Sequence, residues 1–323
     1  MPHLGCPHNC IFCDQRAISG TRSPITKEEV EKACRTASKT PHDIKNSEVA
    51  FFGGSFTAVD IETQKMCLDA AAPFVGTQFG GVRISTRPDC IDEKELEFLK
   101  NHGVASIELG AQSMFDDVLA LNERGHTAAK TVEACRLIKA YGFSLGLQMM
   151  TGLYGSDDEK DIITAKKFVE LKPDTVRIYP TVVLKNTKLC TLYEQQKYTP
   201  PTLESSAMLC AKLLCIFRDA DIKVIRLGLH SGGNVDDGYV AGVYHPAFGE
   251  ICESIIFREK AEKELKDRPA GFYTVLVNTK DISKMTGQAK ANIRYFAAKG
   301  YILTVKASDE MPRNGVSVTA ERK

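Results

Sequence analysis

The sequence predicts an α/β protein in which helices cover a parallel β-sheet that is open or closed into a barrel. Across residues 1–227, short apolar runs alternate with amphipathic stretches, the pattern of parallel strands joined by helical crossovers. Polar residues follow several of these runs, and the C-terminal ends of strands are where α/β barrels build their sites. After residue 227 the alternation loosens. We therefore expect a partial barrel followed by a small α+β region.

Six runs of apolar, β-branched and aromatic residues predict the strands of the sheet. They are Glu48–Phe52, Val82–Thr86, Ser106–Gly110, Ser144–Met150, Thr175–Tyr179 and Lys223–Leu227. Between them, Thr26, Asp92 and Ser156 each precede a glutamate by three residues, which is the spacing of a helix N-terminus. Gly103 and Gly142 stand where glycines commonly end helices.

The residues at the ends of these strands favour a barrel, because they place polar groups along one rim. They are Gly53, Gly54 and Ser55 after the first strand, Ser85 to Arg87 at the second, Glu108 and Gln112 at the third, and Gln148 and Tyr179 at the next two. Consecutive strands that deliver polar groups to one edge indicate a site rather than a core.

The chain divides into three expected regions. Residues 1–250 form the barrel and a closing loop, residues 251–271 a helix and a linker, and residues 272–323 a small α+β domain. The glycine-rich stretch Gly228–Gly249 predicts the long loop. In the last region we expect a strand at 272–277, two short helices about Gly287, a strand at 301–306, a turn at 312–315 and a final strand.

Composition narrows the class of protein. No apolar run approaches the ~20 residues that cross a bilayer, and the N-terminus does not resemble a signal peptide. We therefore expect a cytoplasmic protein without a membrane partner. Its 11 cysteines should then stay reduced, so that a cluster among them indicates metal binding or catalysis rather than disulfides.

The charge is unevenly distributed although the whole chain carries only +1. Residues 258–323 hold 14 Lys and Arg against 8 Asp and Glu, a net charge of +6, and the rest of the chain is acidic. This asymmetry fits either a polyanionic partner for the last region or a solvated basic surface.

Three thiols lie within eight residues in the segment from Cys6 through Cys10 to Cys13. Such spacing lets thiolates from one loop converge on a soft metal centre. Three cysteines leave one iron of a cubane cluster without a protein ligand. The amino and carboxylate groups of S-adenosylmethionine (SAM) can chelate that iron. The alternative is a structural zinc site that His3 or His8 completes.

The spacing of these cysteines, with Phe12 just before the third, resembles the signature of radical SAM enzymes. Further segments are similar to the radical SAM half of the Elongator catalytic subunit and its bacterial relatives, and to oxygen-independent coproporphyrinogen oxidase. The matching segments, within residues 2–230, are PHLGCPHNCIFC, FFGGSFT, ISTRPD, IELGAQS, NERGHT, LGLQMMTGLYG and RIYPTVV. Together they identify the chain as a member of this family with a partial (β/α)6-type barrel.

The resemblance implies cofactors and an activity. A [4Fe-4S] cluster and SAM would be bound, and a flavodoxin- or ferredoxin-type donor would reduce the cluster. SAM would then be cleaved to methionine and a 5′-deoxyadenosyl radical, which abstracts hydrogen from the substrate. An RNA nucleoside, a small molecule and a tetrapyrrole all remain open as substrates.

The resemblance also implies roles for individual residues. Cys6, Cys10 and Cys13 would bind three irons. Gly53 and Gly54 would approach the SAM amino group closely because glycine lacks a Cβ, Ser85 and Arg87 would face the ribose or carboxylate, and Arg124 would pair with the carboxylate. Glu108, Gln112 and Gln148 would line the space between SAM and substrate as catalytic or structural groups. His126, two residues after Arg124, is expected to pack or cap rather than to catalyse.

Two departures limit the resemblance. Only Met1–Gly5 precede the cysteines, so the first barrel strand is expected to be largely missing. Residues 258–323 are too few for the acetyltransferase domain of the Elongator subunit, so no acetyl-CoA chemistry is expected.

A second hypothesis comes from a different class of protein. In the basic region, Gly287 to Lys290 faintly resembles the GXXG loop between two helices of KH domains, with lysine in place of the second glycine. KH loops clamp a nucleic-acid backbone. The alternative is therefore a non-catalytic RNA-binding module with a structural metal, and the two hypotheses merge if the substrate is RNA.

Overall fold

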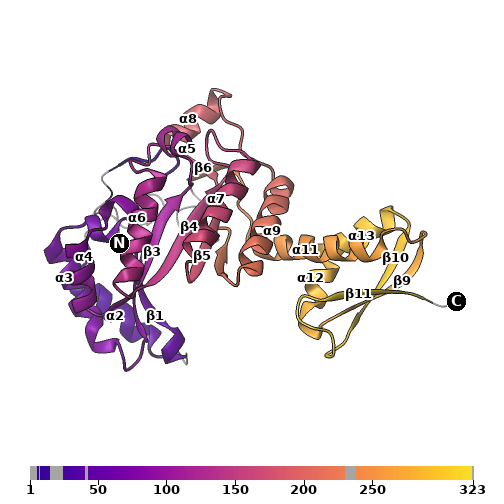
Figure 1. Cartoon of the computed structure of the whole chain (residues 1–323), viewed down its shortest axis with the longest axis horizontal. Helices are drawn as coiled ribbons and strands as arrows, with labels where there is room; N and C mark the ends of the chain where they lie inside the picture. The colour runs from indigo at the N-terminus through magenta and orange to yellow at the C-terminus, as the bar shows by residue number, and fades with distance from the viewer. Residues whose placement is uncertain (1–5, 7, 15–24, 41–42, 230–237, 322–323) are drawn as a thin grey trace. The chain divides into compact units, whose positions relative to one another are not determined.

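The computed structural model describes residues 6, 8–14, 25–40, 43–229 and 238–321 (Figure 1). Six parallel strands form one sheet in which the strands are adjacent in sequence order. They are β1 (Glu48–Phe51), β2 (Gly81–Thr86), β3 (Val104–Gln112), β4 (Ser144–Thr151), β5 (Thr175–Pro180) and β7 (Lys223–Leu227). Each lies within two residues of its predicted bounds. The predicted remnant of a further strand at Met1–Gly5 lies outside the described residues, as does His3.

The sheet is curled into a partial barrel, and contacts between distant strands demonstrate the curl. In a flat sheet, β1 and β5 would lie about 19 Å apart, too far for two side chains to meet. In the structure the guanidinium carbon of Arg177 on β5 lies 4.9 Å from the ring centre of Phe52, directly after β1. The Glu108 carboxylate on β3 binds Arg83 on β2, the adjacent strand, and Arg177 on β5, the next strand but one. The predicted α/β partial barrel is confirmed.

Helices precede and connect these strands, with α2 before β1 and the others after it. They are α2 (Lys27–Ala37), α3 (Ile61–Ala71), α4 (Glu93–Asn101), α5 (Asp116–Leu121), α6 (Ala128–Ala140), α7 (Asp158–Leu171) and α9 (Leu203–Asp219). Single turns of 3₁₀ helix occur at Ile44–Asn46, Phe56–Ala58, Ala72–Phe74 and Pro88–Cys90. β3, in the interior of the sheet, is buried along nearly its whole length, as expected where helices cover one face and side chains fill the other.

Two of the three predicted helix starts are confirmed. Thr26 forms a full capping box with Glu29, and the Asp92 side chain caps α4. The third prediction is wrong by one residue, because the side chain of Asp157, not of Ser156, accepts the N–H of Lys160 at the start of α7. The Ser156 hydroxyl instead donates to the buried carboxylate of Asp161 (2.7 Å).

A small antiparallel pair lies outside the main sheet. β6 (Val182–Leu184) pairs with β8 (Tyr239–Gly242), and α8 (Lys188–Glu194) follows β6. The prediction of one long loop over Gly228–Gly249 is therefore wrong for its second half, because β6 is buried throughout and β8 satisfies its backbone hydrogen bonds. Residues 230–237 of that predicted loop lie outside the described residues.

The chain forms two compact units, residues 1–202 with 216–244, and residues 203–215 with 245–323. The second unit contains α11 (Phe248–Leu265), β9 (Gly271–Val277), α12 (Ile282–Thr286), α13 (Ala291–Ala298), β10 (Tyr301–Ala307) and β11 (Val316–Ala320). Turns of 3₁₀ helix at Thr279–Asp281 and Gln288–Lys290 adjoin α12. β9 is the central strand, parallel to β10 and antiparallel to β11. The predicted small α+β region is confirmed.

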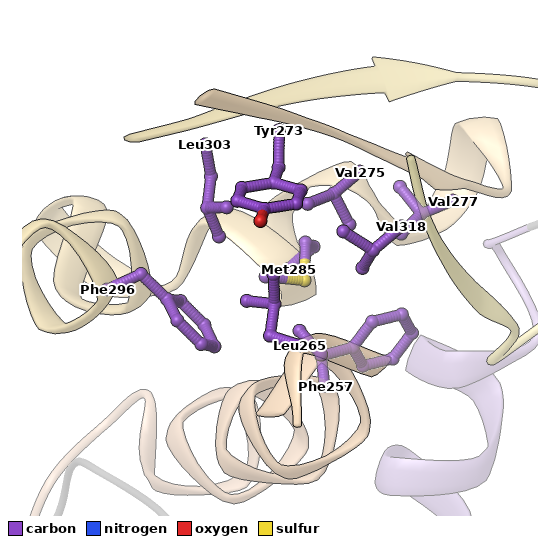
Figure 2. Close-up of a cluster of buried hydrophobic side chains, with 10 residues drawn as sticks. Phe257, Leu265, Tyr273, Val275, Val277, Met285, Phe296, Leu303 and Val318 are labelled. Atoms are coloured by element: carbon purple, nitrogen blue, oxygen red, sulfur yellow. The ribbon is translucent and has the colours of Figure 1, made fainter. Parts of the chain in front are cut away.

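One face of this three-stranded sheet packs against the helices of the unit. Figure 2 shows Tyr273, Val275 and Val277 of β9 facing Phe257 and Leu265 of α11. The remaining helices and the outer strands complete this core with Met285, Phe296, Leu303 and Val318. Among the described residues, no helix is both long and apolar enough to cross a membrane.

Phe296 and Phe272 offer a matched test of this core. Phe296 is 1% exposed within it, whereas Phe272 is 56% exposed. Phe296→Ala should lower the free energy of unfolding by about 3–5 kcal/mol, because it removes buried area and leaves a cavity. Phe272→Ala should change it by about 0.5 kcal/mol or less. Urea unfolding of both variants, followed by circular dichroism, measures the difference; equal losses would contradict the assignment of the core.

Candidate functional site

A cavity of about 1250 Å³ lies at the C-terminal ends of the barrel strands. All three motif cysteines line it, together with seven of the eight other site residues that the sequence predicts. These seven are Gly53, Gly54, Ser85, Arg87, Gln112, Arg124 and Gln148. Residues from four strand ends and from the cysteine loop, residues 6–14, thus meet around one space.

The cysteine loop is in direct contact with Arg124. Nη1 of Arg124 donates to Sγ of Cys10 (3.1 Å), and its Nη2 donates to the carbonyl of Gly110 at the end of β3. Arg87 donates to the Arg124 carbonyl and grips the Asp89 carboxylate with two hydrogen bonds of 3.0 Å. The two guanidinium groups therefore place positive charge beside the thiols.

Burial, and next the neighbouring Cys10, raise the pKa of the Cys6 thiol above its ordinary value. A backbone hydrogen bond from Ser55 and the charges of Arg87 and Arg124 oppose this rise only in part. Thiolates are the species that bind iron and zinc, so the arginines oppose the cost of burying them.

The three thiols line one cavity, which suits a cubane cluster because such a cluster binds each cysteine to a different iron. Within the described ranges, no three His, Cys, Asp or Glu side chains are placed to hold one metal ion. His3, which the zinc alternative could use, lies outside the described residues.

Two buried polar atoms in the cavity wall lack partners within the described part of the chain. They are Oε1 of Gln112, an acceptor at the end of β3, and Nε of Arg124, a donor in the segment after α5. Gln112 also has a φ of 67°, which is uncommon for a residue other than glycine and concentrates at functional sites. Buried polar groups are normally paired, so these atoms fit a polar ligand such as the amino acid part of SAM.

Gly53 and Gly54 line the cavity directly after β1. Their φ angles are 98° and 150°, backbone conformations that residues other than glycine rarely adopt. The backbone there can approach a ligand closely, as the sequence predicts for this pair.

Glu108 is placed differently from the other predicted site residues. It is 1% exposed and is not among the residues that line the cavity. Its carboxylate accepts from Arg83 (3.1 Å), from Arg177 (2.7 and 3.0 Å) and from Gln148 (3.0 Å). Gly146 leaves room for it, because a Cβ there would meet Glu108 Cγ at 2.6 Å. Glu108 thus anchors the side chains around it beneath the cavity.

Several lining residues were not assigned from sequence. Phe52 after β1 and Arg177 on β5 line the cavity, and Asn186 to Lys188 line it from the segment after β6. Tyr179, which the sequence places at the rim, lines it as well. An arginine in the otherwise apolar run of β5 was a signal for Arg177. The Asn186 segment carries no such signal, because only the tertiary structure brings it to the cavity.

The comparisons with known proteins agree with this geometry. Residues 2–168 match the Radical SAM superfamily, and residues 173–258 match the Radical_SAM C-terminal domain. The chain belongs to the radical SAM superfamily. The resemblance that the sequence predicts is therefore confirmed, and membership of the superfamily implies an enzyme that uses an iron–sulfur cluster and SAM.

The chain is similar to several named radical SAM proteins. It is 30% identical over 237 residues to the tRNA uridine(34) acetyltransferase of Methanocaldococcus jannaschii, covering 60% of this chain and 44% of that protein. It is 29% identical over 319 residues to Elongator complex protein 3 of Dictyostelium discoideum, covering 82% of this chain and 56% of that protein. The chain spans about half the length of the curated relatives it matches.

A solved structure confirms the fold. The Elp3 protein of Methanocaldococcus infernus superposes with a TM-score of 0.64 at 24% identity, over 76% of this chain and 61% of that one.

His126 is buried beside the site but is not among the lining residues of the cavity. Burial and, to a lesser degree, the charge of Arg124 lower its pKa from 6.5 to about 4. Its Nε2 lies 3.3 Å from the carbonyl of Ala111, and its Nδ1 has no partner among the described residues. A neutral, packed imidazole agrees with the expectation from sequence.

This lowered pKa predicts how stability depends on pH. A folded-state pKa below the unfolded one stabilises the protein fully above pH 6.5, and the stabilisation is lost as the pH falls toward about 4. His126→Gln should therefore lose less stability than the parent between about pH 7 and pH 4.5. Urea unfolding across this range measures it, with His102→Gln as the control; an unchanged profile in His126→Gln would contradict the prediction.

Proposed function

We propose that the chain is a radical SAM enzyme that holds a [4Fe-4S] cluster on Cys6, Cys10 and Cys13 and cleaves SAM reductively. The observation that supports this most is the shared cavity, which the three thiols, Gly53 and Arg124 all line. A [4Fe-4S] cluster bound there would supply the electron for cleavage of SAM to methionine and the 5′-deoxyadenosyl radical that would take hydrogen from the substrate.

The protein's own residues would bind and orient the cofactors. Gly53 and Gly54 would accept the amino group of SAM at the open backbone after β1. Gln112 and Arg124 would use their unpartnered buried atoms for the polar part of the ligand. Ser85 and Gln148, which are 3.3 Å apart in a hydrogen bond, would face the ribose.

Arg87 would contribute differently from the expectation of a SAM contact. Two of its nitrogens are committed to Asp89 and to the Arg124 carbonyl. It would therefore hold Arg124 in place rather than clamp the ligand, and supply positive charge near Cys6.

A flavodoxin- or ferredoxin-type protein is the expected electron donor.

For the substrate we propose an RNA nucleoside. The similar protein of M. jannaschii is named as acting on a tRNA uridine, which supports RNA over a small molecule or a tetrapyrrole. The basic charge of the second unit gives independent support, because polyanions bind such surfaces.

The first test of this function concerns the cluster and SAM. Reconstituted without oxygen, the protein should hold about four iron and four sulfide per chain, and with dithionite and SAM it should form 5′-deoxyadenosine. Cys6→Ala, Cys10→Ala and Cys13→Ala should each lose both properties. Cys135→Ala, whose thiol is buried in α6 at 1% exposure, should keep them. Stoichiometric zinc with no iron would instead support the non-catalytic module.

The second test concerns RNA and the loop between α12 and α13. The backbone N–H of Lys290 donates to the Gly287 carbonyl, but its side chain has no hydrogen bond or ion pair within the described residues, and the Arg294 side chain donates to the Ala289 carbonyl. Lys299 is different, because Glu262 neutralises it at 2.7 Å. With two phosphate contacts, the slope of log affinity against log salt should be about −1.4 for single-stranded RNA.

Charge reversal at both positions, Lys290→Glu with Arg294→Glu, should flatten this slope and leave SAM cleavage unchanged. Lys306→Glu is the control for net charge in the same unit. Filter binding of total tRNA at several salt concentrations measures the slope, and no binding at low salt would move the proposal toward a small-molecule substrate.

A further inference from the structure

Ile11, between Cys10 and Phe12, ties the cysteine loop to two distant parts of the first unit. Its backbone N–H donates to the carbonyl of Asn122 (3.3 Å), and its carbonyl accepts from the N–H of Leu189 (2.8 Å). Its side chain is 4% exposed. Both peptide groups and the side chain of one residue are thus held directly beside two of the metal-binding thiols.

The Ile11 side chain belongs to a separate hydrophobic cluster. The other buried members are Val183 of β6, Leu189 and Cys190 of α8, and Tyr198. Partly buried residues of β8 pack against the same cluster. We call residues 182–198 together with β8 the brace. Its apolar residues are explained by this contact, because β6 and β8 lie outside the six-stranded sheet.

The contacts of the brace return to Asn122 and so form a closed ring. The Tyr198 hydroxyl donates to the carbonyl of Gly152 (2.7 Å), and its ring meets that of Tyr154 edge-on at 6.2 Å. The carbonyl of Tyr154 accepts from Nδ2 of Asn122 (2.8 Å), which is fully buried. Since the Asn122 carbonyl accepts from Ile11, the path from the cysteine loop through the brace ends where it began.

We propose that this ring positions the cluster ligands, with Leu189 and Asn122 as its positioning residues. The proposal rests on the proposed function, because it concerns the cluster on Cys6, Cys10 and Cys13. Three thiols that bind three irons must be held at set distances, and a short irregular loop has no core of its own to do so. The brace supplies that core from residues far along the chain.

The consequence is kinetic. Iron leaves a cluster when the loop opens, and the population of the open loop depends on the contacts that opening breaks. Weakening the brace should therefore speed iron release even where the global fold persists. A residue that only supports the fold elsewhere should not have this effect.

Leu189→Ala and Leu96→Ala form the matched pair for this test. Both leucines are completely buried, and Leu96 lies on α4, outside the brace and the cavity. In the anaerobically reconstituted protein, Leu189→Ala should release iron to a chelator about tenfold faster than the parent, since such truncations remove packing and leave a cavity. Leu96→Ala should release iron at the parental rate, although both should lose similar global stability.

Two further variants keep the test decisive if Leu189→Ala does not fold. Leu189→Met conserves the volume and should restore slow release. Val183→Ala removes less from the same cluster and should accelerate release to a smaller degree.

Hydrogen exchange on the metal-free protein separates this proposal from the proposed function. In Leu189→Ala, the backbone amides at positions 11 and 189 should exchange faster than in the parent. The amide of Ile107 on β3 should exchange at the parental rate. A parent that takes up no iron would overturn the proposed function and leave this measurement intact. Equal exchange and equal iron release for Leu189→Ala and Leu96→Ala would overturn the role of the brace.

Discussion

The buried carboxylate of Glu108 is the interaction on which the side chains around the base of the site depend. It binds arginines from β2 and β5, on either side of its own strand, and it also receives the amide of Gln148 from β4. A buried charge that loses its partners costs several kcal/mol, so the carboxylate holds side chains of three other strands in fixed positions. The curl of the sheet brings the strand ends together around one cavity, and without it the predicted SAM contacts would lie along an open edge.

The segment Asn122 to Gly125 connects this barrel to the cysteine loop. Asn122 holds the backbone of the loop, and Arg124 reaches the sulfur of Cys10. Gly125 has a φ of 74°, and a Cβ at this position would lie 2.4 Å from the His8 ring. The three residues therefore complement the loop by a backbone contact, a charge and an absent side chain. One short segment therefore both positions the cysteine loop and places a positive charge beside it.

Several charged side chains of the second unit pair with one another. Asp281 is buried and binds Arg313 and Lys284, and Glu262 pairs with Lys299. These pairs leave the net charge of +6 over residues 258–323 unchanged, because that sum already counts the carboxylates, but they hold three cations away from a phosphate. Lys290 and Arg294, near the turn between α12 and α13, are not among these pairs, so that local geometry, more than the total charge, supports the proposed nucleic-acid contact.

Local patterns in the sequence determined the six strands, the α+β order of the second unit and the three-thiol motif, because each depends on neighbours within a few residues. Local signals failed where two groups compete, as at Ser156, whose hydroxyl is drawn to Asp161 while Asp157 caps the helix. They also missed β6 and β8, which are too short to be recognised without each other. Only the tertiary structure decided that Glu108 is an anchor beneath the cavity and that Leu189 lies against the cysteine loop. Both follow from the way the sheet curls and long loops fold back on it. These features depend on contacts between residues far apart in the sequence, which no local pattern relates.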